Sequence, residues 1–356
     1  MKSINRNKML LVILLLFLAV FCKFFQYTFL SEKYFSDSTY ILGLIANNIE
    51  PKGTAFWVTA EFYKLINFLN ISTIQSWSIF LTVIFTFITT MLLYKKKDKY
   101  SLLECIFIVL SFSLLNIFVF NLSKDIIQLI IFIIIYYLID NKKLTTNKKI
   151  AYISIVLILE SIFFRLYYFI VLFGFVLSYI FLNKYTKKIK DSSLISFFIK
   201  ILVIFFLVLS LSSIIFPTRY LQLINARDVI TTILSANTEI RNLIPNSYII
   251  NYIVNGVRIL FPVELLFKSI YYLPFVVYQL MITIVYFNST KKINKSNILL
   301  VSLLTGYNLG SFVFEPDFGS IIRHESVLFM FYLDLFIINR KRRNINEIKK
   351  NMYNDN

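Results

Sequence analysis

The sequence predicts an all-α protein that crosses a membrane many times. Of its 356 residues, 58% are hydrophobic and 16% are charged, whereas a soluble domain is about 45–50% apolar and about 25% charged. Several apolar runs approach or exceed the roughly 20 residues that span a bilayer. We therefore expect one integral membrane domain, residues 1–356, with the helices packed as a bundle.

About ten spans fit the apolar runs. The first run is too long for the core of a signal peptide and lacks a small-residue cleavage site, so we expect a retained anchor. In chain order the expected spans are Met9–Leu30, Gln75–Tyr94, Ser101–Phe120, Leu122–Ile139, Ile150–Ser161, Leu166–Leu182, Ser192–Phe216, Ile270–Phe287, Ile298–Val313 and Ser326–Ile338.

The stretch Ile150–Leu182 requires a break. As one helix it would be about 50 Å long, against a hydrocarbon core of about 30 Å. Glu160 and Arg165 interrupt it, and both flanks are rich in lysine. We expect a tight helical hairpin with these two residues at its tip; one long tilted helix is the alternative.

The lysines and arginines set the orientation. About two thirds of the 37 lie in the amino-terminal segment, the carboxy-terminal tail and every second connection, which predicts cytoplasmic termini by the positive-inside rule. The net charge of +18 then mostly reflects the excess of lysine and arginine on the cytoplasmic side, and nucleic acid is not expected as a partner. Two longer segments, 31–74 and 217–269, fall outside, with interfacial or re-entrant helices expected at Ala55–Leu69 and Tyr248–Leu266.

The sequence offers no soluble cofactor site. It lacks CxxC, HExxH, GxxxxGK and GxGxxG, and Cys22 and Cys105 fall inside expected spans, so a disulfide framework is not expected. The cytoplasmic connections are too short for a nucleotide-binding domain. A substrate must therefore arrive already activated, and a lipid-linked substrate meets that need.

Ionisable residues gather at the expected outer ends of the spans, where charge is costly and indicates a site. Arginine suits a phosphate because its planar fork donates two hydrogen bonds and stays charged. Each residue also has a plainer interpretation, as an anchor at the membrane surface, a polar turn or a counter-ion. The residues in question are Asp37, Lys124, Asp125, Arg165, Arg258, Arg323, Glu325 and the only histidine, His324.

Four short stretches resemble a known family. FEPDFGSIIRHESVLF, FFRLYY, NLSKD and YFSDSTY are similar to the pattern of bacterial repeat-unit polymerases, the Wzy-type proteins of capsule, O-antigen and exopolysaccharide pathways, with EpsG-like proteins as neighbours. The chain departs from that pattern at Leu166 and Val327, where relatives carry proline. The resemblance implies a GT-C-like helical bundle in the bacterial cytoplasmic membrane, with undecaprenyl-diphosphate-linked oligosaccharides as substrates.

The resemblance also implies roles for the charged residues. Arg165, Arg258, Arg323 and Lys124 would stabilise the diphosphate leaving group. His324, Asp37 and Glu325 are the competing candidates for the general base.

No cofactor or metal is expected, although Asp37, Glu315 and Asp317 are carboxylates of a kind that holds one. A chain-length regulator and a flippase are expected partners, besides the membrane lipids themselves. Two alternatives stay open. One is another polyprenyl-phosphate-dependent glycosyltransferase, and the other is a lipid-linked oligosaccharide flippase or transporter, against which the scarcity of Gly and Pro counts.

Overall fold

The computed structural model describes residues 2–30, 35–51, 53–96, 99–188, 248–291, 293–315 and 318–354, together with 203, 204, 207, 210 and 214. Every regular element within these residues is a helix. The chain divides into two units. The first unit comprises Met1–Ile134, Phe163–Arg165 and Arg323–Leu333, and the second comprises Ile135–Ile162, Leu166–Ile322 and Asp334–Asn356.

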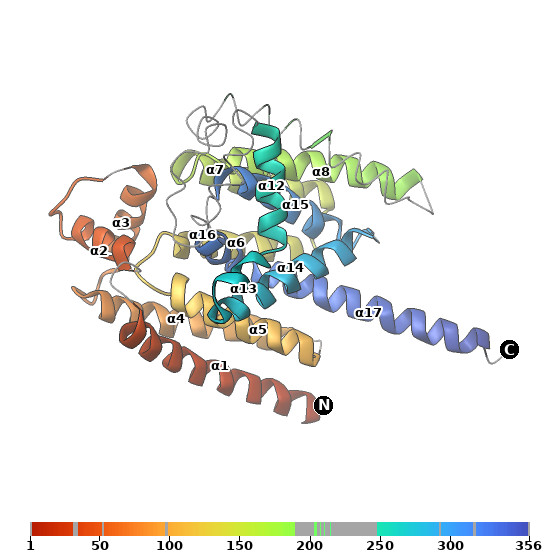
Figure 1. Cartoon of the computed structure of the whole chain (residues 1–356), viewed down its shortest axis with the longest axis horizontal. Coiled ribbons are helices and arrows are strands. Elements are labelled where there is room, and N and C mark those ends of the chain that lie inside the picture. Colours follow the sequence, from red (N-terminus) through yellow and green to blue (C-terminus); the bar gives the residue numbers. More distant parts are fainter. Residues whose placement is uncertain are drawn as a thin grey trace. The chain divides into compact units, whose positions relative to one another are not determined.

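Three long helices form the body of the first unit. They are α1 (Lys2–Phe29), α4 (Ile74–Lys95) and α5 (Leu102–Leu114), and they lie side by side (Figure 1). Two shorter helices, α2 (Ser36–Ile45) and α3 (Thr54–Ile66), connect α1 to α4 and pack together. The first unit therefore has one end at which α1 finishes and α4 starts, and the short helices belong to that end.

Local sequence signals explain where these helices begin. The Thr73 side chain accepts a hydrogen bond from the backbone N–H of Ser76 at the start of α4. Ser101 and Glu104 form a reciprocal capping box at the start of α5, which satisfies two backbone donors that the helix leaves unpaired. A π-helix, Leu115–Val119, continues α5, and such segments are frequent at functional sites.

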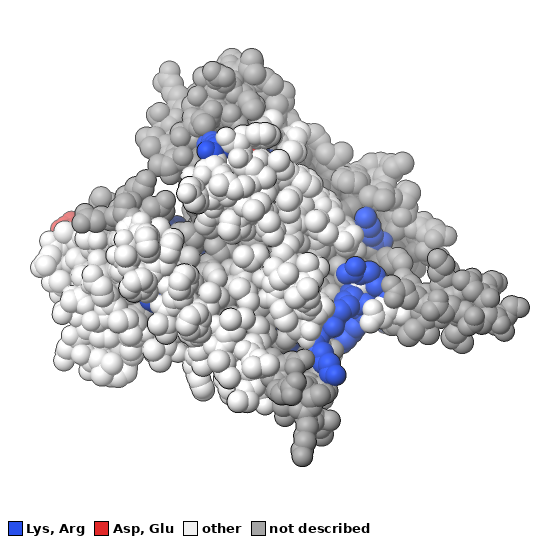
Figure 2. Space-filling model, turned by 60° about the horizontal axis from the view of Figure 1, so that its bottom comes forward, with Lys and Arg blue, Asp and Glu red and all other residues white. Residues whose placement is uncertain are grey.

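The described surface matches a membrane environment. Within the described residues, four helical stretches are long and apolar enough to cross a membrane: Lys8–Phe29, Ile74–Lys95, Leu102–Val119 and Ile270–Thr290. Large apolar side chains on α1, such as Phe17, Val20 and Phe24, are exposed. The described surface in Figure 2 is predominantly uncharged. These helices are therefore suited to contact lipid.

Most of the other expected spans also coincide with helices, although these are shorter or less apolar. They are α6 (Asp125–Asp140), α7 (Thr146–Phe163), α8 (Tyr168–Lys188), α15 (Ile298–Phe314) and α17 (Phe329–Asn354). The expected span Ser192–Phe216 lies almost wholly outside the described residues, as does most of the segment 217–269. The count of ten spans and the orientation therefore stay predictions.

The expected break in the chain near Arg165 is present. α7 ends at Phe163 and α8 begins at Tyr168, so the alternative of one long helix is wrong. Arg165 lies in the turn between the two helices. Glu160 is buried in the last turn of α7, next to this connection.

In the second unit, α8 and α15 touch backbone to backbone. A Cβ atom added to Gly306 would lie 2.5 Å from the backbone oxygen of Val171, and one added to Gly174 would lie 2.8 Å from the Cα of Gly306. Small residues allow such close approach between membrane helices. The two glycines therefore set the distance between these helices.

The remaining helices of the described chain follow Tyr248. The stretch Tyr248–Leu266 was expected as one interfacial or re-entrant helix, and it forms two helices interrupted at Pro262. In order, the elements are α12 (Tyr248–Leu260), α13 (Glu264–Lys268), the 3-10 helix Ile270–Tyr272, α14 (Leu273–Thr290) and α16 (Phe318–Ser326).

Candidate functional site

A buried lysine in α1 shapes the turn that leads to the site. The ammonium group of Lys23 donates to the backbone oxygens of Asn116 (2.6 Å) and Phe120 (2.9 Å). It also donates to the side-chain oxygens of Asn121 (2.8 Å) and Gln26 (3.1 Å). The two backbone carbonyls belong to the π-helix and the turn after it, where regular helix bonding stops. Lys23 thus supplies donors that the backbone at this point lacks.

Two further side chains fix the same turn. The Tyr63 hydroxyl in α3 donates to the backbone oxygens of Asn121 (3.2 Å) and Ser123 (3.0 Å). The Ser78 hydroxyl in α4 donates to the side-chain oxygen of Asn121 (2.6 Å). All these groups are buried. Helices α1, α3 and α4 therefore together determine where the next two residues, Lys124 and Asp125, are placed.

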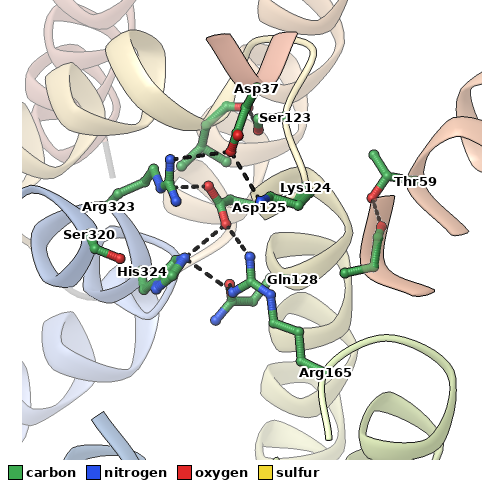
Figure 3. A network of polar contacts seen from close by, with 12 residues as sticks. Asp37, Thr59, Ser123, Lys124, Asp125, Gln128, Arg165, Ser320, Arg323 and His324 are labelled. Carbon is green, nitrogen blue, oxygen red and sulfur yellow. Dashed lines mark hydrogen bonds and ion pairs between the residues drawn. The ribbon is translucent and has the colours of Figure 1, made fainter. Parts of the chain in front are cut away.

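Asp125 is the centre of a charged network (Figure 3). Its Oδ1 lies 2.9 Å from Nη2 of Arg165 and 3.1 Å from Nε2 of His324. Its Oδ2 forms an ion pair with Nε of Arg323 at 2.8 Å. The carboxyl group is only 1% exposed. One buried carboxylate thus holds two guanidinium groups and an imidazole that come from distant parts of the chain.

The protonation of Asp125 follows from these neighbours. Burial alone raises the pKa of a carboxyl group, because it penalises the charged form. Here Arg323, His324 and Arg165 outweigh that effect and hold the pKa of Asp125 well below its usual range. Asp125 lies outside the four helical stretches that are long and apolar enough to cross a membrane. We conclude that it is a carboxylate at neutral pH, which accepts a hydrogen bond from Arg165 and forms an ion pair with Arg323.

Arg165 is engaged on both of its terminal nitrogens. Nη2 faces Asp125, while Nη1 donates to the side-chain oxygen of Gln128 (3.0 Å) and lies 3.1 Å from Nε2 of His324. The same Nε2 atom faces the Asp125 carboxylate. A protonated Nε2 suits the carboxylate and an unprotonated one suits the guanidinium, so the proton on this ring decides which of the two contacts is favourable.

The other side of the network is more open. Asp37, at the start of α2, forms ion pairs with Lys124 (3.2 Å) and Arg323 (3.9 Å), and its side chain is 35% exposed. Lys124 also lies over the ring of Phe56, 3.8 Å from its centre. Burial lowers the pKa of Lys124, and Asp37 opposes this shift. Asp37, Lys124 and Arg323 thus form the part of the site that a ligand can reach.

We call this network the Asp125 cluster. It contains two arginines, one lysine and two carboxylates, so it has an excess of positive charge even without a contribution from His324. Two arginines and a lysine can offer several hydrogen bonds to one anion. The arrangement is therefore suited to an anionic group such as a phosphate. Its members are Asp37, Lys124, Asp125, Gln128, Arg165, Arg323 and His324.

The structure brings together most of the site residues expected from the sequence. Asp37, Lys124, Arg165, Arg323 and His324 all belong to the cluster.

The remaining expected residues have other surroundings. Glu325, next to His324 in α16, is buried. Arg258 belongs to the second unit, where its Nη2 lies 2.7 Å from Oε1 of Glu264. Glu315 accepts a hydrogen bond from Ser320, and Asp317 lies outside the described residues. Among the described residues, no group of three His, Cys, Asp or Glu side chains is placed to hold a metal ion.

Sequence reasoning missed the central role of Asp125 and the part played by Gln128. A signal was available, because the two residues are three positions apart on α6 and such residues share a helix face. Lys23, which lies within the expected span Met9–Leu30, was given no role by sequence reasoning. A lone lysine at that depth needs partners, but the sequence does not indicate which carbonyls provide them.

Comparison of the chain with models of protein families, with curated proteins and with solved structures finds no match. The functional argument therefore depends on the chemistry of the Asp125 cluster and on the resemblance of the short motifs.

Proposed function

We propose that the chain is a glycosyltransferase that polymerises undecaprenyl-diphosphate-linked oligosaccharide repeat units at the outer face of a bacterial cytoplasmic membrane. The product would be a capsular polysaccharide, an exopolysaccharide or O-antigen. The observation that carries the proposal is the Asp125 cluster, an assembly of cations at one end of a membrane-helix unit. The proposal includes a GT-C-like bundle of about ten spans with both termini in the cytoplasm.

The reaction needs little from the protein besides positioning and charge. The hydroxyl oxygen of an acceptor sugar bonds to the anomeric carbon of the donor glycan. The bond from that carbon to the diphosphate oxygen breaks, and its electron pair leaves with the diphosphate. Cations that face this developing charge lower the barrier. Arg323 and Lys124, at the accessible side of the cluster, are suited to that task.

Arg165 has a supporting part in this proposal. Asp125, Gln128 and His324 surround its guanidinium group, and its side chain is 10% exposed. It contributes positive charge from the buried side of the cluster and orients the cluster's other side chains. Arg258 belongs to the second unit, where Glu264 neutralises its charge, so we do not assign it to the diphosphate site.

The proton of the acceptor hydroxyl must go to a general base. Asp37 has the best position among the three candidates, because its carboxylate is on the accessible side of the cluster. His324 Nε2 faces Asp125 and Arg165 instead, and Glu325 is buried. We therefore assign the role of general base to Asp37. His324 holds the Asp125 carboxylate and the Arg165 guanidinium group in position.

The proposal requires no metal or cofactor. A flippase that delivers repeat units and a chain-length regulator are its expected partners.

A strain from which the gene is deleted tests the proposal. Lipid-linked glycans are extracted and sized, and the site of accumulation is determined with an impermeant sugar-oxidising reagent. We expect single complete repeat units at the outer face and no long polymer. Loss of another glycosyltransferase would instead leave incomplete units, and loss of a flippase would leave complete units inside. Either result would overturn the proposal.

A further inference from the structure

A long apolar groove lies between α1 and α4 in the first unit. Its volume is about 1000 Å³, at the upper end of the roughly 300–1,000 Å³ typical of small-molecule sites. Leu16, Ala19 and Val20 contribute to one wall, and Thr82, Val83 and Thr86 contribute to the other. We call this feature the α1–α4 groove.

The groove is open because small side chains line its middle. Ala19 faces the threonines of α4, and neither residue type fills the space between two helices as leucine would. Two of the threonine hydroxyls are turned to the backbone: Thr82 donates to the oxygen of Phe120 (3.4 Å) and Thr90 to that of Thr86 (2.7 Å). The hydroxyl oxygen of Thr86 is buried. The wall therefore presents little polarity to whatever occupies the groove.

The position of the groove defines the kind of occupant. Along α1 it extends from Val12 to Thr28, which corresponds to about 24 Å at 1.5 Å per residue. Both helices are long and apolar enough to span the hydrocarbon core. A sugar or nucleotide would lose its hydration there without compensation. A long hydrocarbon chain fits the environment and the shape.

One end of the groove adjoins the Asp125 cluster through shared residues. Lys23 lines the groove, and its ammonium group holds the turn before Lys124. Tyr27, at the same end, stacks on Phe35 with ring centres 5.5 Å apart, two positions before Asp37. The apolar groove and the cationic site are therefore parts of one continuous structure within the first unit.

We propose that the α1–α4 groove binds the polyprenyl chain of the lipid-linked substrate, with the diphosphate of the same molecule at the Asp125 cluster. This inference rests on the proposed function and adds a binding site for the lipid tail. A polyprenyl diphosphate combines a long hydrocarbon chain with a concentrated negative charge at one end. The groove matches the chain, and the excess positive charge of the cluster matches the head.

The test blocks the groove and leaves the cluster intact. Val83 lines the groove and is 65% exposed, whereas its neighbour Ile84 is 36% exposed and is not part of the lining. Val83→Trp and Ile84→Trp are therefore matched variants that add the same ring on adjacent positions of one helix. The detergent-solubilised full chain is titrated with undecaprenyl diphosphate, inorganic diphosphate and a phosphatidylglycerol, and binding is followed by native mass spectrometry.

We expect Val83→Trp to weaken undecaprenyl diphosphate binding at least about tenfold, a loss of about 1.4 kcal/mol. Ile84→Trp should bind it as the wild type does, and inorganic diphosphate should bind all three proteins equally.

Four results would overturn the inference. Unchanged binding by Val83→Trp would place the tail elsewhere, and the proposed function would survive if Arg323→Ala still weakened binding. Equal binding of phosphatidylglycerol, with the same loss in Val83→Trp, would identify a general lipid groove. A dimer that dissociates only in Val83→Trp would identify an interface between two copies. Failure of the wild type to bind undecaprenyl diphosphate would contradict the proposed function as well.

Discussion

The ammonium group of Lys23 lies 2.9 Å from the backbone oxygen of Phe120, and this contact ties a membrane-spanning helix to the turn that carries Asp125. A buried lysine in a span usually indicates a functional pathway. Here its partners are carbonyls at the end of a π-helix, so its role is to hold a backbone segment in place. The charged site thus depends on a cation that is not itself placed to meet a ligand.

Replacement of Lys23 by methionine should destabilise the first unit. The variant keeps the length of the side chain but removes the Lys23 donor from the oxygens of Asn116, Phe120 and Asn121. Phe120 and Asn121 keep the hydroxyls of Thr82 and Ser78 as donors. A buried group left without a partner costs about 1–3 kcal/mol, so we expect a loss of at least about 2 kcal/mol in the free energy of unfolding. Denaturant titration in detergent measures it. Phe21→Met, at an exposed position of the same helix, is the control and should change little.

Asp125→Asn should disorganise the cluster. Removal of the charge leaves two arginines close together without the carboxylate that pairs with them, and breaking a buried ion pair costs about 3–5 kcal/mol. We expect a lower unfolding temperature and loss of polymer formation. A variant with normal stability would contradict the central place of this carboxylate.

Asp37→Asn should separate activity from stability. Its ion pairs are partly exposed, and pairs of that kind contribute about 0–1 kcal/mol. If Asp37 is the general base, polymer formation should fall at least about 100-fold, while the unfolding temperature stays near that of the wild type. An active Asp37→Asn protein would return the base role to His324 or Glu325.

The surroundings of the Asp125 carboxyl group predict how the stability of the fold depends on pH in acid. Burial raises its pKa, but Arg323, His324 and Arg165 outweigh this and hold the folded-state pKa well below the usual value of about 3.9. The stabilisation is therefore fully present above about pH 4 and is lost as the pH falls through the folded-state pKa. Unfolding curves should show a steeper decline below pH 4 for the wild type than for Asp125→Asn. Parallel curves would count against the ion pairs.

Cysteine labelling tests the orientation of the chain. Glu61 in α3 is about half exposed, and Lys143, between α6 and α7, is exposed. In a background without Cys22 and Cys105, an impermeant maleimide should label Glu61→Cys in intact cells and should label Lys143→Cys only after lysis. The reverse pattern would invert the topology.

Sequence alone predicted the helical membrane class, the break at Arg165 and five members of the cluster. These predictions depended on local signals: apolar runs of sufficient length, and charged residues at their ends. A helix was also expected at Ala55–Leu69, because that stretch has periodic apolar residues, and α3 (Thr54–Ile66) lies there. No helix had been expected at the position of α2.

The rest required long-range information. Asp125 and Arg323 are 198 positions apart, and no local pattern shows that one carboxylate pairs with guanidinium groups from two other regions. Lys23 and Asn116 present the same difficulty. No sequence pattern indicates that a donor in one helix pairs with a backbone carbonyl in another. The contact of Gly174 with Gly306 depends likewise on how α8 and α15 cross.

The most direct test of the central claim is the length of lipid-linked glycan made in a deletion strain that carries Arg323→Ala. Arg343→Ala, in the exposed part of α17, is the matched control, and membrane levels of both proteins are measured in parallel. If the cations of the Asp125 cluster stabilise the diphosphate, Arg323→Ala should accumulate single repeat units while Arg343→Ala makes normal polymer. Polymer of normal length from Arg323→Ala, at normal protein level, would contradict the account.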